Sequence, residues 1–332
     1  MDMVTLGRSG LKVSRACLGT MTFGNTAWGT DEAESKKIVG AFLDAGHNFI
    51  DTADVYNSGV SEEIVGRCIG HRRDAVALAT KGYNVMGPGP NDRGSSRAHL
   101  TRALEDSLRR LGTEYVDLYQ LHNWDHGTPI EESMATLHDF VTAGKVRYIG
   151  CSNFFASQMV EAQWAAARVG ATPLVSLQPQ YSLIWRDIEL DILPTAARHG
   201  MGVIVWSPLG GGMLTGKYAK GAVTDVDGRL SRGHGVEAEG MRALTMTDRN
   251  FAIVSEVTAV AGELGSTPTA VSLAWLLGRP GVTSVIIGPR TAGQLGQNME
   301  GFDLDLPSEA GKRLSRISRK PVSYPWYMQL QM

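Results

Sequence analysis

Residues 97–125, RAHLTRALEDSLRRLGTEYVDLYQLHNWD, read as a helix followed by a strand. Between Leu100 and Leu111 the apolar side chains recur at intervals of three and four residues, which predicts an amphipathic helix. The run YVDLYQL from Tyr115 then predicts a short buried strand, and a polar residue, His122, follows it directly. Units of this kind along the chain decide the fold.

Short strand-like runs alternate with helical stretches from about residue 15 to residue 300. This alternation is typical of βα units around a parallel sheet, and eight units predict a (β/α)8 barrel of the TIM type. The predicted strands begin at Ala16, Asn48, Val76, Tyr115, Arg147, Leu174, Gly202 and Ser284.

Three segments fall outside the alternation. Residues 1–14 predict a β-hairpin around Ser9 and Gly10, which could plug the bottom of the barrel. Residues 217–248 are rich in Gly, Arg and Asp without sustained periodicity, so they predict a long loop, and such loops are commonly functional. Residues 307–332 predict a short helix and an aromatic-rich tail. We expect residues 1–332 to form a single domain.

Composition excludes several classes of protein. The formal net charge of -2 is spread along the chain and offers no basic field for nucleic acid. Cys17, Cys68 and Cys151 are scattered, which favours a reducing compartment over a disulfide framework or a cysteine zinc site. The chain shows no signal-peptide core and no apolar run of the ~20 residues that a membrane span needs. We therefore expect a cytoplasmic protein with no membrane partner.

Polar residues stand where the predicted strands end, which in a parallel barrel is the functional face. Asp51 ends the second strand, Lys81 and His122 follow the third and fourth, and Tyr56 lies in the loop after Asp51. A tyrosine with an ordinary pKa near 10 donates its proton reluctantly at neutral pH, but a nearby ammonium stabilises the phenolate. We expect Lys81 to supply that charge and Asp51 to keep Lys81 charged. His122 would orient a carbonyl oxygen or share the proton.

Seven segments in order then resemble a known family. The segments are FIDTADVYNSGVSEEIVG, the strand that ends in Lys81, YVDLYQLHNWD, YIGCSNF, LQPQYSL, WSPLGGGMLTGKY and VIIGPRTAGQLGQN. Together they resemble the aldo-keto reductases of bacterial type, with similarity to the channel-associated β-subunit branch, and the resemblance extends from the N-terminal hairpin to about Gly301.

This resemblance implies a reversible, NADPH-dependent reduction of an aldehyde or ketone to an alcohol. Asp51, Tyr56, Lys81 and His122 fall on the family's catalytic tetrad, with Tyr56 as the general acid and the hydride coming from nicotinamide C4. The substrate partner is then a small carbonyl compound, and no metal ion is expected.

The resemblance also assigns cofactor contacts. Ser152, Asn153 and Gln178 match positions that hydrogen-bond the nicotinamide carboxamide, and Trp206 matches an aromatic that stacks on the ring. An arginine fork suits a phosphate, so Arg290 favours NADPH over NADH. The other implied positions are Ser207, Leu209, Gly211 and Lys217 around the pyrophosphate, with Gly288, Arg290, Gln294 and Asn298 around the adenosine 2′-phosphate and adenine.

Aromatic residues in predicted loops indicate a substrate pocket. Trp28, Trp124 and Trp326 would line it together with Tyr56, which favours a moderately apolar aldehyde or ketone. Tryptophans at a barrel rim are also common as ordinary packing residues.

Other interpretations stay open at this point. The rim residues Ser152, Asn153 and Gln178 could simply satisfy backbone groups. The chain could be a non-catalytic NADP(H)-binding regulatory protein, or a metal-dependent barrel hydrolase using His122 and residues 125–126, although no HxH follows the first strand. A serine hydrolase fits less well, since GCSNF is not the GxSxG motif.

Overall fold

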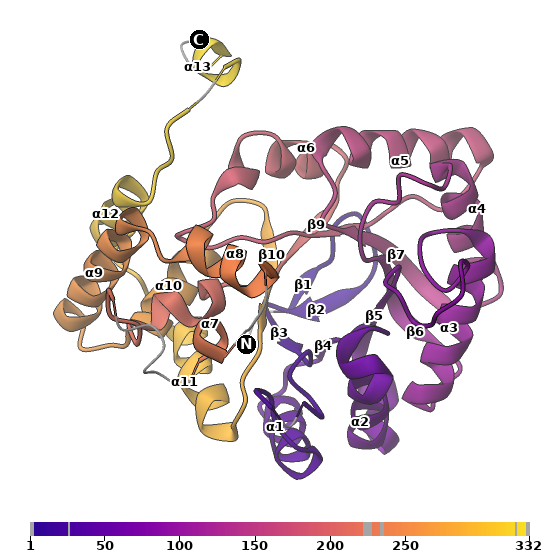
Figure 1. Ribbon diagram of the computed structural model, residues 1–332, viewed down its shortest axis with the longest axis horizontal. Coiled ribbons are helices and arrows are strands. Elements are labelled where there is room, and N and C mark those ends of the chain that lie inside the picture. The colour runs from indigo at the N-terminus through magenta and orange to yellow at the C-terminus, as the bar shows by residue number, and fades with distance from the viewer. Residues whose placement is uncertain (1–2, 26, 222–227, 233–235, 323, 330–332) are drawn as a thin grey trace. The chain divides into compact units, whose positions relative to one another are not determined.

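Eight parallel strands close into a barrel in the order β10-β3-β4-β5-β6-β7-β8-β9 (Figure 1). This arrangement confirms the predicted (β/α)8 fold and all eight predicted strands. The computed structural model describes residues 3–25, 27–221, 228–232, 236–322 and 324–329. The barrel strands are β3 Ala16–Gly19, β4 Phe49–Asp51, β5 Ala77–Gly82, β6 Val116–Leu121, β7 Val146–Ser152, β8 Ser176–Gln178, β9 Gly202–Val205 and β10 Val282–Ile287.

The parallel register brings the carboxyl ends of the strands to one rim. Lys81 on β5 pairs with Gln120 on β6, and Ser152 on β7 pairs with Gln178 on β8. Asp51, the last residue of β4, lies beside Ala79 of β5. The polar residues that end these strands therefore meet at the same edge of the barrel.

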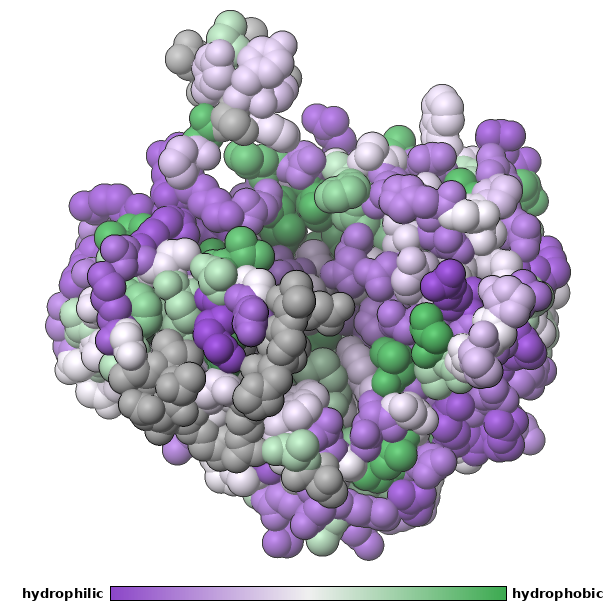
Figure 2. Space-filling view, in the orientation of Figure 1, coloured by the Kyte–Doolittle hydropathy of each residue, from purple (hydrophilic) through white to green (hydrophobic). Residues whose placement is uncertain are grey.

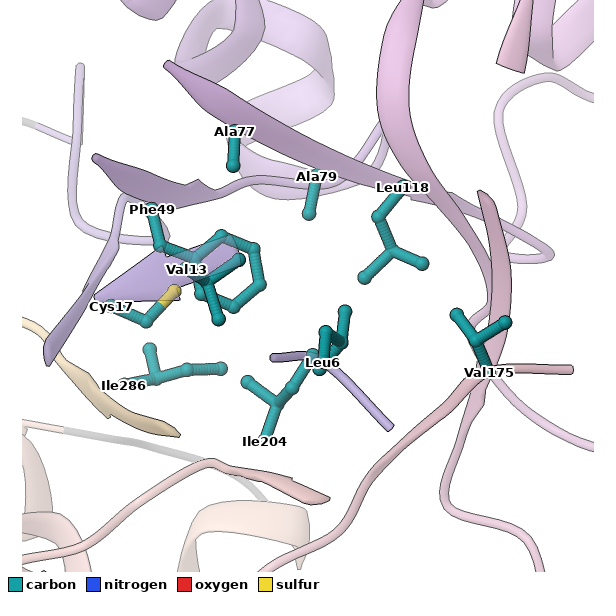
Figure 3. Close-up of a cluster of buried hydrophobic side chains, with 10 residues drawn as sticks. All are labelled: Leu6, Val13, Cys17, Phe49, Ala77, Ala79, Leu118, Val175, Ile204 and Ile286. Carbon is teal, nitrogen blue, oxygen red and sulfur yellow. The ribbon is translucent and has the colours of Figure 1, made fainter. Parts of the chain in front are cut away.

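The N-terminal hairpin closes the opposite end, as predicted. Its strands, β1 Met3–Thr5 and β2 Lys12–Ser14, pair antiparallel. Leu6 and Val13 are fully buried in a cluster with side chains of the barrel strands, including Phe49 and Ile204 (Figure 3). The backbone N–H of Arg8 donates to the carbonyl of Gly200, just before β9. These contacts fill the amino ends of the strands with apolar side chains.

Helix α3 shows why the amphipathic pattern predicts helices in this chain. It spans Arg97–Leu111, begins with the hydroxyl of Ser96 as its cap, and ends at Gly112 in the left-handed conformation. Its apolar stripe is buried, including Leu100 and Leu104. The other helices are α1 Glu32–Asp44, α2 Val60–Ile69, α4 Ile130–Thr142, α5 Ala156–Val169, α6 Ile192–Arg198, α7 Arg229–Arg232, α8 Val236–Thr245, α9 Asp248–Glu263, α10 Pro268–Leu277, α11 Ala292–Asp303, α12 Ser308–Ile317 and α13 Trp326–Gln329.

The chain divides into two compact units. The first contains the hairpin and the barrel and comprises Met1–Pro179, Thr195–Trp206 and Gly281–Gly296. The second comprises Gln180–Pro194, Ser207–Pro280 and Gln297–Met332, and within it α9 packs against α10 and α12. The single domain expected over residues 1–332 stays a prediction.

The predicted loop at residues 217–248 contains helices, so the prediction of an irregular segment was wrong there. Helices α7 and α8 form within it, while residues 222–227 and 233–235 lie outside the described residues. The α8 sequence, VEAEGMRALT, consists largely of good helix formers, and these outweigh Gly240 in its middle. The guanidinium of Arg242 also donates to the carbonyl of Leu230, which ties α8 to α7.

None of the helices in the described part of the chain is long and apolar enough to cross a membrane. The face drawn in Figure 2 is mostly hydrophilic, and its apolar residues form small separate patches.

Candidate functional site

A buried ion pair lies at the carboxyl rim of the barrel. Lys81 of β5 places Nζ 2.6 Å from Oδ2 of Asp51 on β4, and the two side chains are 0% and 2% exposed. The same ammonium donates to the carbonyl of Thr52 at 2.8 Å and to the hydroxyl of Tyr56 at 3.3 Å. Three of the four predicted catalytic residues therefore meet around one nitrogen atom.

The pKa of Lys81 is raised above its usual value. Burial alone would lower it, because removing an ammonium from water disfavours the charged form. The negative charge of Asp51, the influence of Tyr56 and the hydrogen bonds to both outweigh that penalty. Lys81 is thus held as an ammonium ion inside the barrel rim.

Tyr56 is half-buried, in the loop that leaves β4. It begins the short helix η1, Tyr56–Gly59. The other three residues of η1 are left-handed: Asn57, Ser58 and Gly59 have φ of 49°, 53° and 94°. Such a conformation is costly for residues other than glycine and is often found at functional sites. The turn leads the chain directly into α2, and the ring of Tyr56 stays 4.9 Å from Nζ of Lys81.

His122 joins the same group from the end of β6. Its ring lies edge-on to Tyr56, with centroids 5.9 Å apart and planes at 79°. Burial and the nearby charge of Lys81 lower the pKa of His122 to about 3, so the ring is neutral at physiological pH. The four predicted catalytic residues are therefore adjacent in space, around the ammonium of Lys81.

Two residues that the sequence did not suggest belong to this cluster. Gln120 is fully buried on β6 and donates from Nε2 to Oδ1 of Asp51 at 3.2 Å. Asn84, in the loop after β5, places Nδ2 2.9 Å from Nδ1 of His122. Strand alternation could have revealed Gln120, since it shares a face with the buried Leu118, whereas Asn84 carries no signal in the sequence.

The predicted nicotinamide residues lie together in the first unit. The hydroxyl of Ser152 donates to the carbonyl of Gln178 at 2.8 Å, and Nε2 of Gln178 donates to Asp51 at 2.8 Å. Asn153 has φ of 59°, donates from Nδ2 to the carbonyl of His122 and accepts from Nε1 of Trp206 at 3.1 Å. Trp206 is half-buried.

This set fits a carboxamide. After the contacts just described, Ser152 keeps acceptor lone pairs, Asn153 keeps a second N–H, and the amide oxygen of Gln178 can accept. A carboxamide offers two N–H donors and one acceptor oxygen, so the remaining groups are complementary to it. Ser152 and Asn153 also donate to backbone carbonyls, which fits the alternative that these rim residues satisfy backbone groups.

The predicted pyrophosphate residues belong to the second unit. Ser207 has φ of 55°, and Gly210, Gly211 and Gly212 follow with φ of 57°, 68° and 91°. The positive φ of Gly211 favours glycine in this turn, and an added Cβ would also lie a tight 3.2 Å from the side chain of Leu230. Leu209 and Lys217 flank the turn, and Asn298 is buried in α11.

The predicted phosphate residues at the start of α11 are engaged in local contacts. The side-chain oxygen of Gln294 accepts from the backbone N–H of Arg290 at 2.8 Å. A carboxylate oxygen of Glu34, on α1, accepts from the N–H of Ala292 at 2.8 Å. That backbone hydrogen bond, followed by the one from Lys37, lowers the pKa of Glu34. An acidic side chain thus occupies the helix end beside Arg290, and Gly288 lies just after β10.

The predicted pocket tryptophans have different surroundings. Trp124 packs edge-on against Phe154, with ring centroids 5.2 Å apart. Trp28 is half-buried, and its backbone N–H donates to Oδ1 of Asn25. Trp326 begins α13 in the second unit. Their role as substrate contacts stays a prediction.

A second buried polar group adjoins the ion pair. Glu62 on α2 is fully buried and accepts from the hydroxyl of Thr80 at 2.6 Å and from Nε of Arg110 at 2.7 Å. Asp54 is also fully buried, and neither of its carboxylate oxygens meets a hydrogen-bond partner among the described residues. Burial, with the charge of Glu62 adding to it, raises the pKa of Asp54 to about 7.

The loop after His122 is held by its own hydrogen bonds. Asp125 accepts from the backbone N–H groups of Ser95 and Gly127 and from the hydroxyl of Thr128.

Over the described ranges, no three His, Cys, Asp or Glu side chains are grouped so that they could hold a metal ion.

The chain is similar to known proteins over nearly its whole length. The model of the aldo/keto reductase family matches residues 15–319. An uncharacterized oxidoreductase of Bacillus subtilis, YrpG, is 39% identical over 98% of this chain and 100% of its own length. A probable voltage-gated potassium channel subunit beta of Arabidopsis thaliana is 38% identical over 92% of each chain. The aldo-keto reductase YhdN of Bacillus subtilis is 34% identical over 98% of this chain and 96% of its own. The protein with this sequence belongs to the aldo/keto reductase family.

Proposed function

We propose that this protein reduces an aldehyde or ketone to the alcohol, with NADPH as the hydride donor and Tyr56 as the proton donor. The observation that carries the proposal is the position of Lys81. Its fully buried ammonium lies between the carboxylate of Asp51 and the phenol of Tyr56.

The chemistry follows from these contacts. NADPH, when bound, would supply the hydride from nicotinamide C4 for the carbonyl carbon. Tyr56 gives its phenolic proton to the carbonyl oxygen, which becomes the hydroxyl of the alcohol. Lys81 stabilises the phenolate left on Tyr56, and Asp51 keeps Lys81 charged. Positioned acids of this kind contribute about 10²- to 10⁴-fold to the rate.

The cofactor would be held by two sets of residues. Ser152, Asn153 and Gln178 would bind the carboxamide through their remaining donors and acceptors, and Trp206 would stack on the nicotinamide ring. The remainder of the dinucleotide would contact the residues that the family resemblance assigns: Ser207, Leu209, Gly211, Lys217, Gly288, Arg290, Gln294 and Asn298.

The substrate we propose is a moderately apolar aldehyde or ketone, with Trp28 and Trp124 as its predicted aromatic contacts in the first unit. We place the protein in the cytoplasm, where NADPH is available and thiols stay reduced. The cysteines support a reducing compartment, because Cys17, Cys68 and Cys151 are all free thiols.

The test is oxidation of NADPH by the purified protein with a panel of apolar aldehydes and ketones. We expect steady turnover in the wild type and a loss of at least about a hundredfold in Tyr56→Phe. Tyr115→Phe is the matched control. Tyr115 lies just before β6, at the end of the strand away from the rim, and its hydroxyl donates to Asp74. Tight NADPH binding without turnover on any carbonyl would instead favour a non-catalytic, nucleotide-binding role.

A further inference from the structure

Hydrogen bonds hold both the backbone and the ring of His122. Its backbone N–H donates to the carbonyl of Gly82 at 3.1 Å, and its own carbonyl accepts from Nδ2 of Asn153 at 3.1 Å. The ring itself is held at one nitrogen, Nδ1, by Nδ2 of Asn84 at 2.9 Å. Asn84 lies in the loop after β5, and the carbonyl of the preceding Tyr83 accepts from the N–H of Gly94.

With Nδ2 of Asn84 facing the ring, the contact favours one tautomer of His122. An amide nitrogen can only donate hydrogen bonds, so in this orientation of Asn84 the Nδ1 atom of His122 accepts and carries no proton. A neutral imidazole has one proton, which then resides on Nε2. Burial and the ammonium of Lys81 lower the pKa of His122 to about 3 and thereby keep the ring neutral.

We propose that Asn84 is a positioning residue that holds His122 as the Nε2–H tautomer, so that the ring can donate a hydrogen bond to the substrate's carbonyl oxygen. This inference rests on the proposed reductase function. A carbonyl oxygen only accepts, so the other tautomer would face it with a lone pair and would repel it. A donor aimed at an oxygen that gains negative charge typically contributes about 10²- to 10³-fold to kcat.

Asn84→Asp reverses the polarity of the contact with little change in shape. A carboxylate accepts from Nδ1–H, so His122 should switch to the Nδ1–H tautomer and lose the proton on Nε2. The new negative charge also favours imidazolium and raises the pKa of His122. Imidazolium carries protons on both nitrogens, so acidification restores the Nε2–H donor.

The first experiment is NMR of the full chain labelled with ¹⁵N-histidine. The signals of His122 are assigned among the eight histidines by their loss in His122→Gln. We expect the wild type to show a protonated Nε2 and an unprotonated Nδ1, and Asn84→Asp to show the reverse at alkaline pH. The matched control is Asn91→Asp, an exposed asparagine of the same loop, which should retain the wild-type pattern.

The second experiment measures kcat and KM against pH. Asn84→Asp should lose about a hundredfold in kcat at alkaline pH, with a smaller change in KM, and should regain activity as the pH falls through the raised pKa of His122. Asn84→Ala removes the preference for one tautomer of His122 without adding a charge. Its loss of kcat should be smaller than that of Asn84→Asp, and activity should not recover as the pH falls.

These readouts separate the inference from the proposed function. A wild-type ring protonated on Nδ1, or a loss in Asn84→Asp that is equal at every pH, overturns the inference while carbonyl reduction stands. A wild type that reduces no carbonyl overturns the proposed function, and the NMR spectra still decide whether Asn84 controls the tautomer.

Discussion

Gln178 donates from Nε2 to Oδ1 of Asp51 at 2.8 Å, while Lys81 occupies the other carboxylate oxygen at 2.6 Å. Both oxygens are therefore used: Oδ1 accepts from the amides of Gln178 and Gln120, and Oδ2 pairs with the ammonium. A carboxylate held in this way cannot rotate away from the cation. The carboxylate of Asp51 also links β4, β5 and β8 through side chains. Gln178, which is predicted to bind nicotinamide, therefore also helps to hold the ion pair between Asp51 and Lys81.

We expect Asp51→Asn to shift the pH dependence of the reaction. Without the carboxylate, burial should dominate and lower the pKa of Lys81, which Asp51 now holds above its usual value. The ammonium then loses its proton at a lower pH, so activity should fall on the alkaline side earlier than in the wild type. Profiles of kcat/KM between about pH 6 and pH 10 check this. Asp106→Asn, an exposed carboxylate on α3, is the control.

The prediction fails if Asp51→Asn and the wild type lose activity at the same alkaline pH. In that case the charge on Lys81 would not depend on Asp51.

Lys81→Met should abolish turnover while leaving NADPH binding intact. The side chain keeps a similar volume but cannot stabilise the phenolate of Tyr56, so we expect a loss of at least about a hundredfold in kcat. Quenching of tryptophan fluorescence by NADPH reports folding and binding in the same sample. Lys145→Met, a partly exposed lysine paired with Glu105, serves as the control. Turnover near the wild-type rate would contradict the role of Lys81.

The barrel could be predicted from the sequence because each buried parallel strand reads as a short apolar run with a polar residue at its end. Asp51, Lys81 and His122 were found for this reason, and the register brings them together as expected. The regular structure of α8 was missed because its residues lie in a segment rich in Gly and Arg.

Side-chain partners were harder to predict than positions. Nothing in the sequence states that Gln178 turns toward Asp51, that Asn84 reaches the ring of His122, or that Glu34 caps α11. Such pairs join residues far apart along the chain, and their distances depend on the twist of the barrel and on rotamers. Only three-dimensional geometry reveals them.

Glu34→Gln should improve the binding of NADPH relative to NADH. The carboxylate of Glu34 accepts from the N–H of Ala292 beside Arg290, so it would repel an adenosine 2′-phosphate bound there. Removing the charge should lower the Kd for NADPH by about two- to fivefold, with little effect on NADH. Titration of tryptophan fluorescence with each dinucleotide measures both values.

The control for this charge change is Glu32→Gln. Glu32 lies in the same turn of α1, but its carboxylate bonds Arg67. An equal effect of both variants, or an equal gain for NADPH and NADH, would contradict a 2′-phosphate site at this end of α11.

Asp54→Asn should stabilise the protein at neutral and alkaline pH. Burial, with the charge of Glu62 adding to it, raises the pKa of Asp54 to about 7, whereas an unfolded aspartate titrates near 4. Between about pH 4 and pH 7 the folded state therefore binds a proton that the unfolded state lacks. The contribution of Asp54 to the free energy of unfolding is complete below about pH 4 and is lost as the pH rises through about 7. An asparagine is neutral throughout and avoids this loss. The difference in Tm between Asp54→Asn and the wild type should therefore increase from about pH 6 to pH 8, while the exposed control Asp106→Asn should show no such trend. A constant difference across that range would mean that Asp54 is already ionised in the folded protein at pH 6, so that its pKa is not raised.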